Sequence, residues 1–370
     1  MTTAATPTVT IEEVAAVAGV SRSTVSRVVN GSTAVSPAAL QAVHDAIAKL
    51  NYVPNRAART LASRTTNAIA LVVPEDPTRF FGDPYFASVV GGIHSRLSTT
   101  PYVLNVFLAS DDLGDKTTAY VRGGNIDGAL IVSHHARDSF VRRIADSVPV
   151  VFAGRPSQAD IAERSYYVDV DNVLGGRLGT QELIDAGRTH VATIACPSDM
   201  PPGVDRLIGF EAALADAGLR AAGVVEGDFS EAGGAQAMRE LLERGVPIDG
   251  VFVANDLMAR GAMAVLADAG LRIPDDVAVV GFDDSVIATQ VSPRLSTVSQ
   301  PTFAQGELMV DVLLGLLSGT QPERVTIVEP AMVSRESVDQ SGSARAPRSR
   351  GTRSATDQHR RPLGSRPGNL

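Results

Sequence analysis

The sequence predicts a small all-α helix-turn-helix headpiece followed by an α/β core of two lobes, each a doubly wound parallel sheet. Two short helical patterns joined by a tight turn lie within residues 10–31, and from residue 67 onward short apolar runs alternate with helical patterns. Near-continuous apolar strands that alternate with helices are typical of parallel sheets covered on both faces. There are too many such units for one sheet of ordinary size, so we expect two similar lobes.

The two helical patterns form the stretch TIEEVAAVAGVSRSTVSRVVNG, residues 10–31. In its first half, apolar residues recur at helical spacing. Gly19 accepts the backbone dihedrals that a sharp turn needs, and Ser21 is placed to cap the second helix with its hydroxyl. The buried face of the second helix is expected to consist of Val25, Val28 and Val29.

The open face of the second helix combines small hydrogen-bonding side chains with two guanidinium groups, those of Arg22, Ser23, Thr24, Ser26 and Arg27. A short helix with this composition is suited to the major groove of DNA. The same two-helix pattern also fits an ordinary helical hairpin, so by itself it does not establish a DNA-binding unit. The stretches that flank the two helices favour DNA binding.

Residues 35–37 (VSP) open a third helical pattern, and NYVPNRAARTLASR follows at residues 51–64. With AGVSRSTVSRVVNG and LNYVPNRAARTLA at this spacing, the run resembles the DNA-binding headpiece of the lactose/galactose-repressor (LacI-type) family of bacterial transcription regulators. The resemblance implies a recognition helix at residues 22–30. It also implies that Pro54 introduces a hinge helix, residues 55–62, whose Leu61 wedges into the minor groove.

The resemblance implies distinct roles for these side chains. We expect Arg22, Ser23 and Arg27 to read bases, and Thr24, Ser26, Asn30 and Tyr52 to contact the DNA backbone. The full set of expected DNA-binding residues is Thr10, Ser21, Arg22, Ser23, Thr24, Ser26, Arg27, Asn30, Tyr52, Asn55, Arg56, Ala58, Arg59, Leu61 and Ala62.

The pattern along the chain predicts five segments. They are a flexible N-terminus (1–9), the headpiece (10–54), the hinge helix and linker (55–66), a two-lobed ligand-binding and dimerisation core (67–338) and a disordered Arg-rich tail (339–370). The core segments VDVDNVLGG (168–176), DRLIGF (205–210), ANDLMARGAM (254–263) and IPDDVAVVGFDDS (273–285) resemble the periplasmic-binding-protein-like core of the same family. We expect the chain to cross between the lobes near residues 160–164, 286–293 and 324–329.

Ligands of such sheets bind beyond the carboxyl ends of the strands, which here means the cleft between the lobes. Polar or aromatic residues that follow strand ends are the candidates for effector binding: Glu75, Phe86, His134, Arg155, Arg206, Phe229, Asn255, Asp283 and Gln300. Carboxylate, amide and guanidinium groups beside an aromatic ring suit a sugar, because the ring covers the C–H face and the polar groups bind hydroxyls. Phe86 is equally compatible with a place in the core.

The resemblance assigns Arg206, Phe229, Asn255 and Asp283 to effector-binding positions of the family and places Gln300 near them. One departure stands out. Several sugar- and purine-responsive relatives have an acidic residue where Gly154 aligns, which predicts a ligand with a different hydroxyl pattern.

The distribution of charge and the number of cysteines limit the classes of function that this protein can have. The net charge of the 370 residues is −8, but residues 1–65 hold six Lys/Arg against three acidic residues and the tail holds seven Arg against two Asp. A basic headpiece on an acidic body suits a protein that touches DNA at one end. A single cysteine, Cys196, excludes an intramolecular disulfide and fits the cytoplasm. No secretory signal or membrane-spanning run is visible.

We find no phosphate-binding glycine loop, no GxSxG elbow and no metal-ligand spacing among the six histidines. We therefore expect no enzyme and no cofactor. The sequence predicts a cytoplasmic, homodimeric transcription regulator, a repressor, that binds a near-palindromic operator in double-stranded DNA. Its effector is expected to be a sugar. The alternatives are a sugar-binding transport protein and a constitutive DNA-binding regulator without a ligand.

Overall fold

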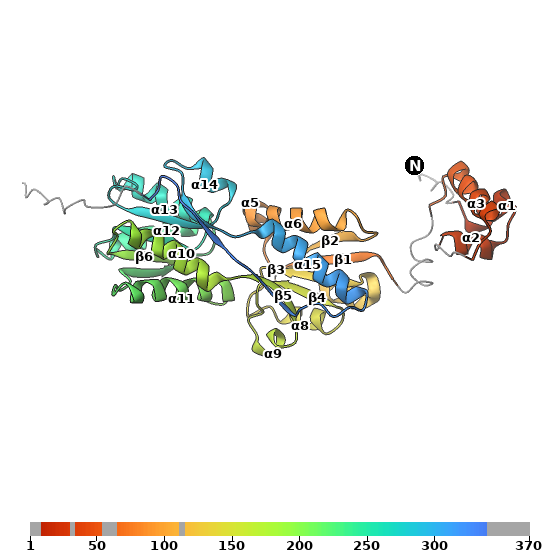
Figure 1. The fold of residues 1–370 in the computed structure, drawn as a ribbon, viewed down its shortest axis with the longest axis horizontal. Coiled ribbons are helices and arrows are strands. Elements are labelled where there is room, and N and C mark those ends of the chain that lie inside the picture. Colours follow the sequence, from red (N-terminus) through yellow and green to blue (C-terminus); the bar gives the residue numbers. More distant parts are fainter. Residues whose placement is uncertain (1–8, 30–33, 54–64, 111–114, 339–370) are drawn as a thin grey trace, which may run out of the picture.

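The computed structural model describes residues 9–29, 34–53, 65–110 and 115–338 of the chain (Figure 1). Its headpiece comprises α1 (Ile11–Ala18), α2 (Arg22–Val29) and α3 (Pro37–Leu50). Thr10 caps α1, because its hydroxyl accepts the Glu13 N–H at 3.3 Å while its own N–H donates to the Glu13 carboxylate at 2.7 Å. The three helices bury a shared core around Val14, Val25 and Val43. These contacts confirm the predicted helix-turn-helix unit.

The core consists of two sheets, each with six strands in the described part of the chain. The first-lobe sheet has the order β11-β5-β4-β3-β1-β2 and the second-lobe sheet the order β12-β10-β9-β8-β6-β7. Neighbouring strands are parallel except that β12 runs antiparallel to β10. The strands of the first lobe are β1 (Ala68–Val73), β2 (Val103–Leu108), β3 (Gly128–Val132), β4 (Val150–Ala153), β5 (Tyr166–Val170) and β11 (Val325–Val328). Those of the second are β6 (Val191–Ala195), β7 (Gly223–Glu226), β8 (Gly250–Val253), β9 (Ala278–Asp283), β10 (Ser296–Ser299) and β12 (Ala331–Val333).

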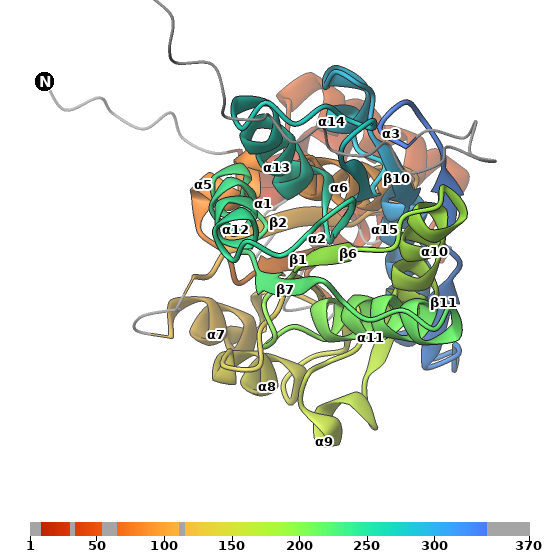
Figure 2. The same cartoon turned by 90° about the vertical axis from the view of Figure 1, so that its left-hand side faces the viewer.

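Helices cover both faces of each sheet, as predicted. The first lobe contains α5 (Pro77–Gly82), α6 (Pro84–Leu97), α7 (Lys116–Tyr120, continued by a π-turn at Val121–Asn125), α8 (Ser139–Ala145), α9 (Ala159–Ala162) and α15 (Thr302–Leu317). The second contains α10 (Asn172–Asp185), α11 (Pro201–Asp216), α12 (Glu231–Glu243), α13 (Asp256–Asp268) and α14 (Val286–Gln290). In the end-on view, the α12–α13 pair lies on one side of β6 and β7 and the α10–α11 pair on the other (Figure 2).

The chain passes between the lobes at three connections, after β5, after β10 and between β11 and β12. The crossings expected near residues 160–164 and 286–293 are therefore wrong, whereas the third expectation, at 324–329, overlaps the real one. The error arose because β5 and β10 were not recognised as strands. The sequence of β10, STVS, looks like a loop, yet Ser296 and Thr297 are fully buried and hydrogen-bonded to Ser337 and Asp256.

Glycines set the distance between the helices of three packed pairs. A Cβ at Gly92 of α6 would lie 2.0 Å from the Phe303 carbonyl oxygen of α15. A Cβ at Gly176 of α10 would lie 2.1 Å from the Arg206 oxygen of α11, and one at Gly261 of α13 would lie 2.0 Å from the Glu231 oxygen of α12. Real Cβ atoms essentially never approach backbone that closely, so each pair can pack backbone against backbone because glycines, including Gly306, Gly209 and Gly234 on the partner helices, stand at the contact.

This packing yields a stability prediction. Gly92→Ala should lower the free energy of unfolding by roughly 1–3 kcal/mol, because α6 and α15 must move apart. Gly82→Ala is the matched control: its Cβ would meet nothing within 4 Å, so it should change stability by less than about 0.5 kcal/mol. Chemical denaturation of the full chain followed by circular dichroism measures both, and equal stability of the two variants would contradict the packing account.

Candidate effector cleft and DNA-binding face

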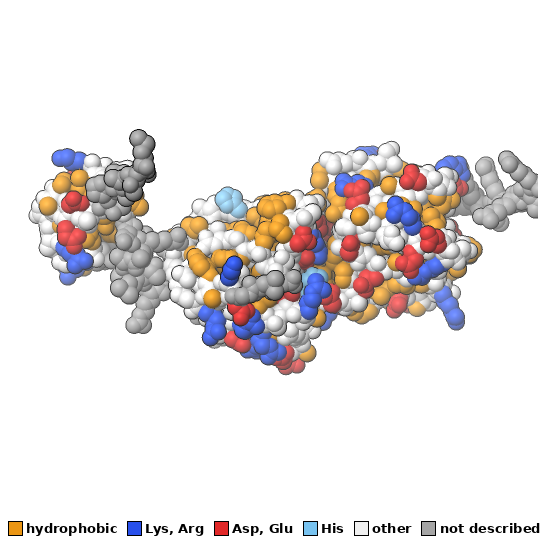
Figure 3. All heavy atoms as spheres, turned by 180° about the vertical axis from the view of Figure 1, so that it is seen from behind, with side chains coloured by type: hydrophobic (Ala, Val, Ile, Leu, Met, Phe, Trp, Pro, Cys, Tyr) orange, Lys and Arg blue, Asp and Glu red, His pale blue; other side chains and the backbone are white. Residues whose placement is uncertain are grey.

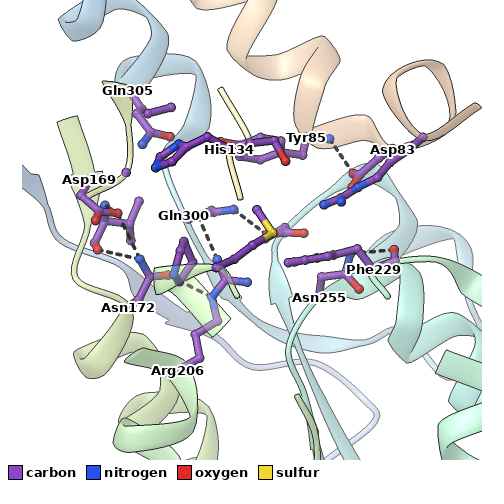
Figure 4. Close-up of a pocket in the computed structure, with 18 residues that line it drawn as sticks. Asp83, Tyr85, His134, Asp169, Asn172, Arg206, Phe229, Asn255, Gln300 and Gln305 are labelled. Carbon is purple, nitrogen blue, oxygen red and sulfur yellow. Dashed lines mark hydrogen bonds between the residues drawn. The ribbon is translucent and has the colours of Figure 1, made fainter. Parts of the chain in front are cut away.

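A cleft between the lobes is lined by side chains that follow the carboxyl ends of strands from both sheets (Figure 4). Six of the nine expected effector residues line it, namely His134, Arg206, Phe229, Asn255, Asp283 and Gln300. The other lining residues are Arg79, Asp83, Tyr85, Ser133, Ala153, Gly154, Asp169, Val170, Asn172, Met200, Pro202 and Gln305. The structure thus brings together most of the set that was named from the sequence.

Arg206 of α11 is the central cation of the cleft, with 5% of its surface exposed. Its Nε donates to Asn172 Oδ1 at 2.9 Å, its Nη1 donates to the Ala254 carbonyl at 2.6 Å, and its Nη2 lies 3.5 Å from Gln300 Oε1. The guanidinium carbon also lies 3.6 Å from the centroid of the Phe282 ring. A buried charge needs such partners, since an unpaired one is strongly destabilising. The side chain is therefore held rigidly, with one edge toward the cleft.

Asp283 ends β9 in a strained backbone conformation, with φ of 113°. Its Oδ1 accepts Nε2 of Gln300 at 2.5 Å. Burial raises the pKa of Asp283 well above the ordinary value against the opposing effect of the Arg206 charge, and the carboxylates of Asp256 and Asp83 raise it further. Strain of this kind persists where the surrounding structure imposes it, which is common at ligand sites.

Asn255 and Phe229 form the second-lobe wall. Asn255 caps α13 through Oδ1, which accepts the Met258 N–H at 2.9 Å, and its Nδ2 donates to the Phe229 carbonyl at 3.2 Å. Phe229 has φ of 67°, and the guanidinium of Arg79 from the first lobe lies 4.3 Å from its ring centroid. The aromatic face that was expected to cover a sugar is therefore stacked on a cation from the opposite lobe.

The first-lobe wall carries hydrogen-bonding atoms that have no protein partner among the described residues. Both ring nitrogens of His134 and Oε1 of Gln305 are buried and unpartnered, although Nε2 of Gln305 donates to the Val168 carbonyl at 2.8 Å. Burial lowers the pKa of His134 to about 4, against the opposing effect of the nearby Arg155 backbone, so the ring is neutral near pH 7. It then offers one N–H donor and one acceptor, which is what a hydroxyl group needs.

Gly154 lies in the lining with φ of 88°. A Cβ added there would lie 3.7 Å from Asp169 Oδ1. A carboxylate therefore stands beside the position where several relatives carry an acidic side chain, but it comes from the neighbouring strand β5. Asp169 accepts the N–H groups of Arg155 and Val170, each at 2.8 Å.

Three expected effector residues lie outside the lining. Phe86 is 2% exposed and packs in the first-lobe core, the alternative that the sequence had left open. Arg155 forms an ion pair at 2.8 Å with Asp205 of the second lobe. Oε1 of Glu75 accepts from Ser133, Arg79 and His135, so the carboxylate binds other side chains of the first lobe.

Sequence reasoning missed several lining residues, of which seven carry polar side chains: Arg79, Asp83, Tyr85, Ser133, Asp169, Asn172 and Gln305. Asp169 and Asn172 stood inside the quoted segment VDVDNVLGG, and they flank the end of an unrecognised strand. Asp83 precedes a proline and caps α6, a signal that a helix start was near. Gln305 belongs to α15, for which no helix was predicted.

The expected DNA-reading side chains lie on one face of α2. Ser21, Arg22, Ser23 and Arg27 are exposed, whereas Val25 and Val28 are buried. Ser21 Oγ accepts the Thr24 N–H at 3.1 Å, so the hydroxyl caps α2 as predicted. The Arg22 guanidinium pairs with Glu12 at 2.8 Å, but both groups are exposed and such a pair is easily exchanged for a DNA contact. Tyr52 packs into the headpiece core with 9% exposure.

The remaining expected DNA-binding residues, Asn30, Asn55, Arg56, Ala58, Arg59, Leu61 and Ala62, lie outside the described residues, and so do residues 1–8 and the tail 339–370. On the visible face of the core, acidic and basic side chains are interspersed (Figure 3). No group of His, Cys, Asp and Glu suited to a metal ion occurs in the described ranges. Among the helices of those ranges, none is long and apolar enough to cross a membrane.

Comparison with known proteins agrees with this geometry. Residues 10–55 match the description "Bacterial regulatory proteins, lacI family", and residues 180–338 match a periplasmic binding protein-like domain. The HTH-type transcriptional regulator CelR of Thermobifida fusca is 44% identical over 335 residues, which are 89% of this chain and 98% of CelR. The ribose operon repressor of Escherichia coli K12 is 34% identical over 85% of this chain and 94% of its own length.

Two solved structures extend the match to the fold. A complex of the transcriptional regulator CelR with cellobiose has 42% identity and a TM-score of 0.71, over 89% of this chain and 99% of that one. The lac repressor dimer bound to operator and an anti-inducer has 29% identity and a TM-score of 0.79, over 90% and 99%. The chain therefore belongs to the lactose/galactose-repressor (LacI) family of bacterial DNA-binding transcriptional regulators.

Proposed function

We propose that this protein is a cytoplasmic, homodimeric repressor whose DNA binding is controlled by a β-linked glucose disaccharide, cellobiose, bound between the lobes. The sugar assignment rests on a contrast in hydrogen bonding between the two sides of the cleft. The second-lobe groups around Arg206 are already hydrogen-bonded to one another, whereas His134 and Gln305 of the first lobe present unpartnered atoms. A polyhydroxyl ligand satisfies those atoms.

Similarity supports the choice of cellobiose over other sugars. The CelR structure that aligns with 89% of this chain at 42% identity is a cellobiose complex. The departure at Gly154 fits a ligand other than those of relatives with an acidic residue there, because the nearby carboxylate of Asp169 approaches from a different strand.

For DNA, we propose that Arg22, Ser23 and Arg27 read bases in the major groove, and that the hinge residues around Leu61 open the minor groove at the centre of a near-palindromic operator. The exposure of these three side chains on one face of α2 supports the major-groove assignment. The proposed role of Leu61 rests on the family pattern alone.

Removing the unpartnered nitrogens of the cleft should weaken effector binding. We expect His134→Phe to lower the affinity for cellobiose by about tenfold, since one hydrogen-bonding group of the cleft is lost while the ring against Phe152 is kept. Isothermal titration calorimetry of the full chain measures this. His94→Phe, on the exposed side of α6, is the control and should bind like the wild type. Unchanged binding by His134→Phe would remove His134 from the site, and no binding by the wild type would refute cellobiose as effector.

Removing a guanidinium from the exposed face of α2 should weaken operator binding. We expect Arg27→Ala to reduce the affinity for an operator selected from random duplexes by about ten- to a hundredfold, with a smaller loss on unrelated DNA. Arg220→Ala removes the same charge from an exposed site of the second lobe and should leave operator affinity unchanged. Fluorescence anisotropy measures both. Equal losses on operator and unrelated DNA would show that Arg27 contacts only phosphates.

A further inference from the structure

A charged cluster beside the cleft joins the two lobes through the imidazole of His135. The ring lies between two carboxylates, with Nε2 3.1 Å from Glu75 Oε1 and Nδ1 2.9 Å from Asp199 Oδ2. Glu75 follows β1 and His135 follows β3, both in the first lobe, whereas Asp199 precedes α11 in the second lobe. The His135 side chain is 5% exposed.

A neutral imidazole has one N–H donor, so it cannot donate to two carboxylates at once. The imidazolium can, because both ring nitrogens then carry a proton. Burial alone would lower the pKa of His135, but the hydrogen bonds to Glu75 and Asp199 outweigh burial and raise the pKa above its ordinary value. Both hydrogen bonds, to Glu75 and to Asp199, can therefore form at the same time only when the His135 ring is protonated.

Other charged groups also face this ring. Arg79 of α5 donates to Glu75 Oε1 at 2.7 Å, and Arg137 donates to Asp199 Oδ2 at 3.1 Å. The carboxylate of Asp138 accepts the backbone N–H of His135 at 2.7 Å. Burial opposes ionisation of Glu75, but the hydrogen bond from His135, the charge of Arg79 and the hydrogen bond from Ser133 outweigh burial and lower the pKa of this carboxyl.

The cluster also positions the walls of the cleft. The backbone N–H of Ala136 donates to the Asp199 carbonyl at 3.1 Å across the lobe boundary. His134, one residue before His135, lines the cleft from the first lobe, and Met200, one residue after Asp199, lines it from the second. His135 therefore contributes, together with Ala136 and Arg137, to the contacts that hold these two opposing wall segments together.

We propose that His135 is a positioning residue which, as the imidazolium, latches the second lobe to the first in the arrangement that binds the effector, so that effector affinity falls when the ring loses its proton. This inference rests on the proposed function for its ligand. It assigns Glu75, which was expected to touch the effector, to the latch.

The raised pKa of His135 determines how effector affinity should change with pH. Because the pKa of His135 is raised in the folded chain, the latch is fully present below the ordinary value of about 6.5 and is lost as pH rises through the folded value. His134 does not titrate in this range, since its pKa is about 4. Burial raises the pKa of two other carboxyls near the cleft, that of Asp256 to about 7 and that of Asp283 well above its ordinary value. The readout is therefore the difference between the wild type and a variant that lacks His135 and retains Asp256.

The test is calorimetric titration of the full chain with cellobiose between about pH 6 and about pH 9. We expect wild-type affinity to fall by about tenfold over this range, as a charge-assisted hydrogen bond is lost, with proton uptake on binding visible in buffers of different ionisation enthalpy. His135→Gln should bind weakly at every pH. His190→Gln is the matched control, because the His190–Asp249 pair at 3.4 Å lies within the second lobe, and it should follow the wild type.

Asp199→Asn provides a second variant that keeps the imidazole in place. The amide still accepts from Nδ1–H but lacks the charge, so we expect the fall in affinity to move to lower pH. An equal pH dependence in wild type and His135→Gln would overturn the latch, and so would an Asp199→Asn profile that coincides with the wild type.

A ligand-free measurement separates failure of the latch from failure of the sugar assignment. Spin labels at the exposed positions of Glu163→Cys in the first lobe and Arg239→Cys in the second, in a Cys196→Ala background, report the distance between the lobes. We expect the distance distribution to broaden as pH rises, and to be broad at every pH when His135→Gln is added. If the wild type binds no cellobiose but shows this change, the sugar assignment fails and the latch stands. A distribution that is independent of pH refutes the latch.

Discussion

The buried guanidinium of Arg206 is the constraint on which the arrangement of the core depends. One donor engages Asn172, which lies at the first connection between the lobes, and another faces Gln300, which lies in the second connection. A third engages the Ala254 carbonyl at the end of β8. A charge buried in this way is tolerated only while its partners stay in place. A ligand that touches Arg206 or its partners would therefore contact two of the segments that connect the lobes.

The two sides of the cleft differ in their hydrogen bonding. The second-lobe side is preorganised by hydrogen bonds within the protein, whereas the first-lobe side has polar atoms without a partner in the described residues. In the second lobe, Asn255 caps a helix and Asp283 is held by Gln300, so these groups are fixed before any ligand arrives. In the first lobe, His134 and Gln305 retain unpartnered atoms. The helices of each lobe pack closely at their glycines, which favours movement of one lobe against the other over deformation of either lobe. That division is what a regulator needs if binding between the lobes is to alter the DNA-binding end.

Most of the architecture was predictable because its elements have strong local signals. The apolar runs of β1, β3 and β9 and the helical spacing of α1 to α3 follow directly from burial on one face or on both. Asp283 at the end of β9 could be named as a lining residue for the same reason, whereas Arg206 of α11 was named from the family resemblance. What failed was the recognition of β5 and β10, whose polar residues are buried because distant side chains bind them, as Asp256 binds Thr297. Such partners are invisible in a local pattern. Phe86 and Glu75 were misplaced for a related reason, since a residue next to a strand end can pack inward or serve another side chain as well as face the cleft.

The proposed effector contacts both lobes of the core at once. Hydrogen exchange measured by mass spectrometry on the full chain, with and without cellobiose, can detect such a contact. Peptides that contain His134 in the first lobe and those that contain Asp283 in the second should gain protection together, over the same range of cellobiose concentration. Protection confined to one lobe, or gained in the two lobes at different concentrations, would contradict the claim.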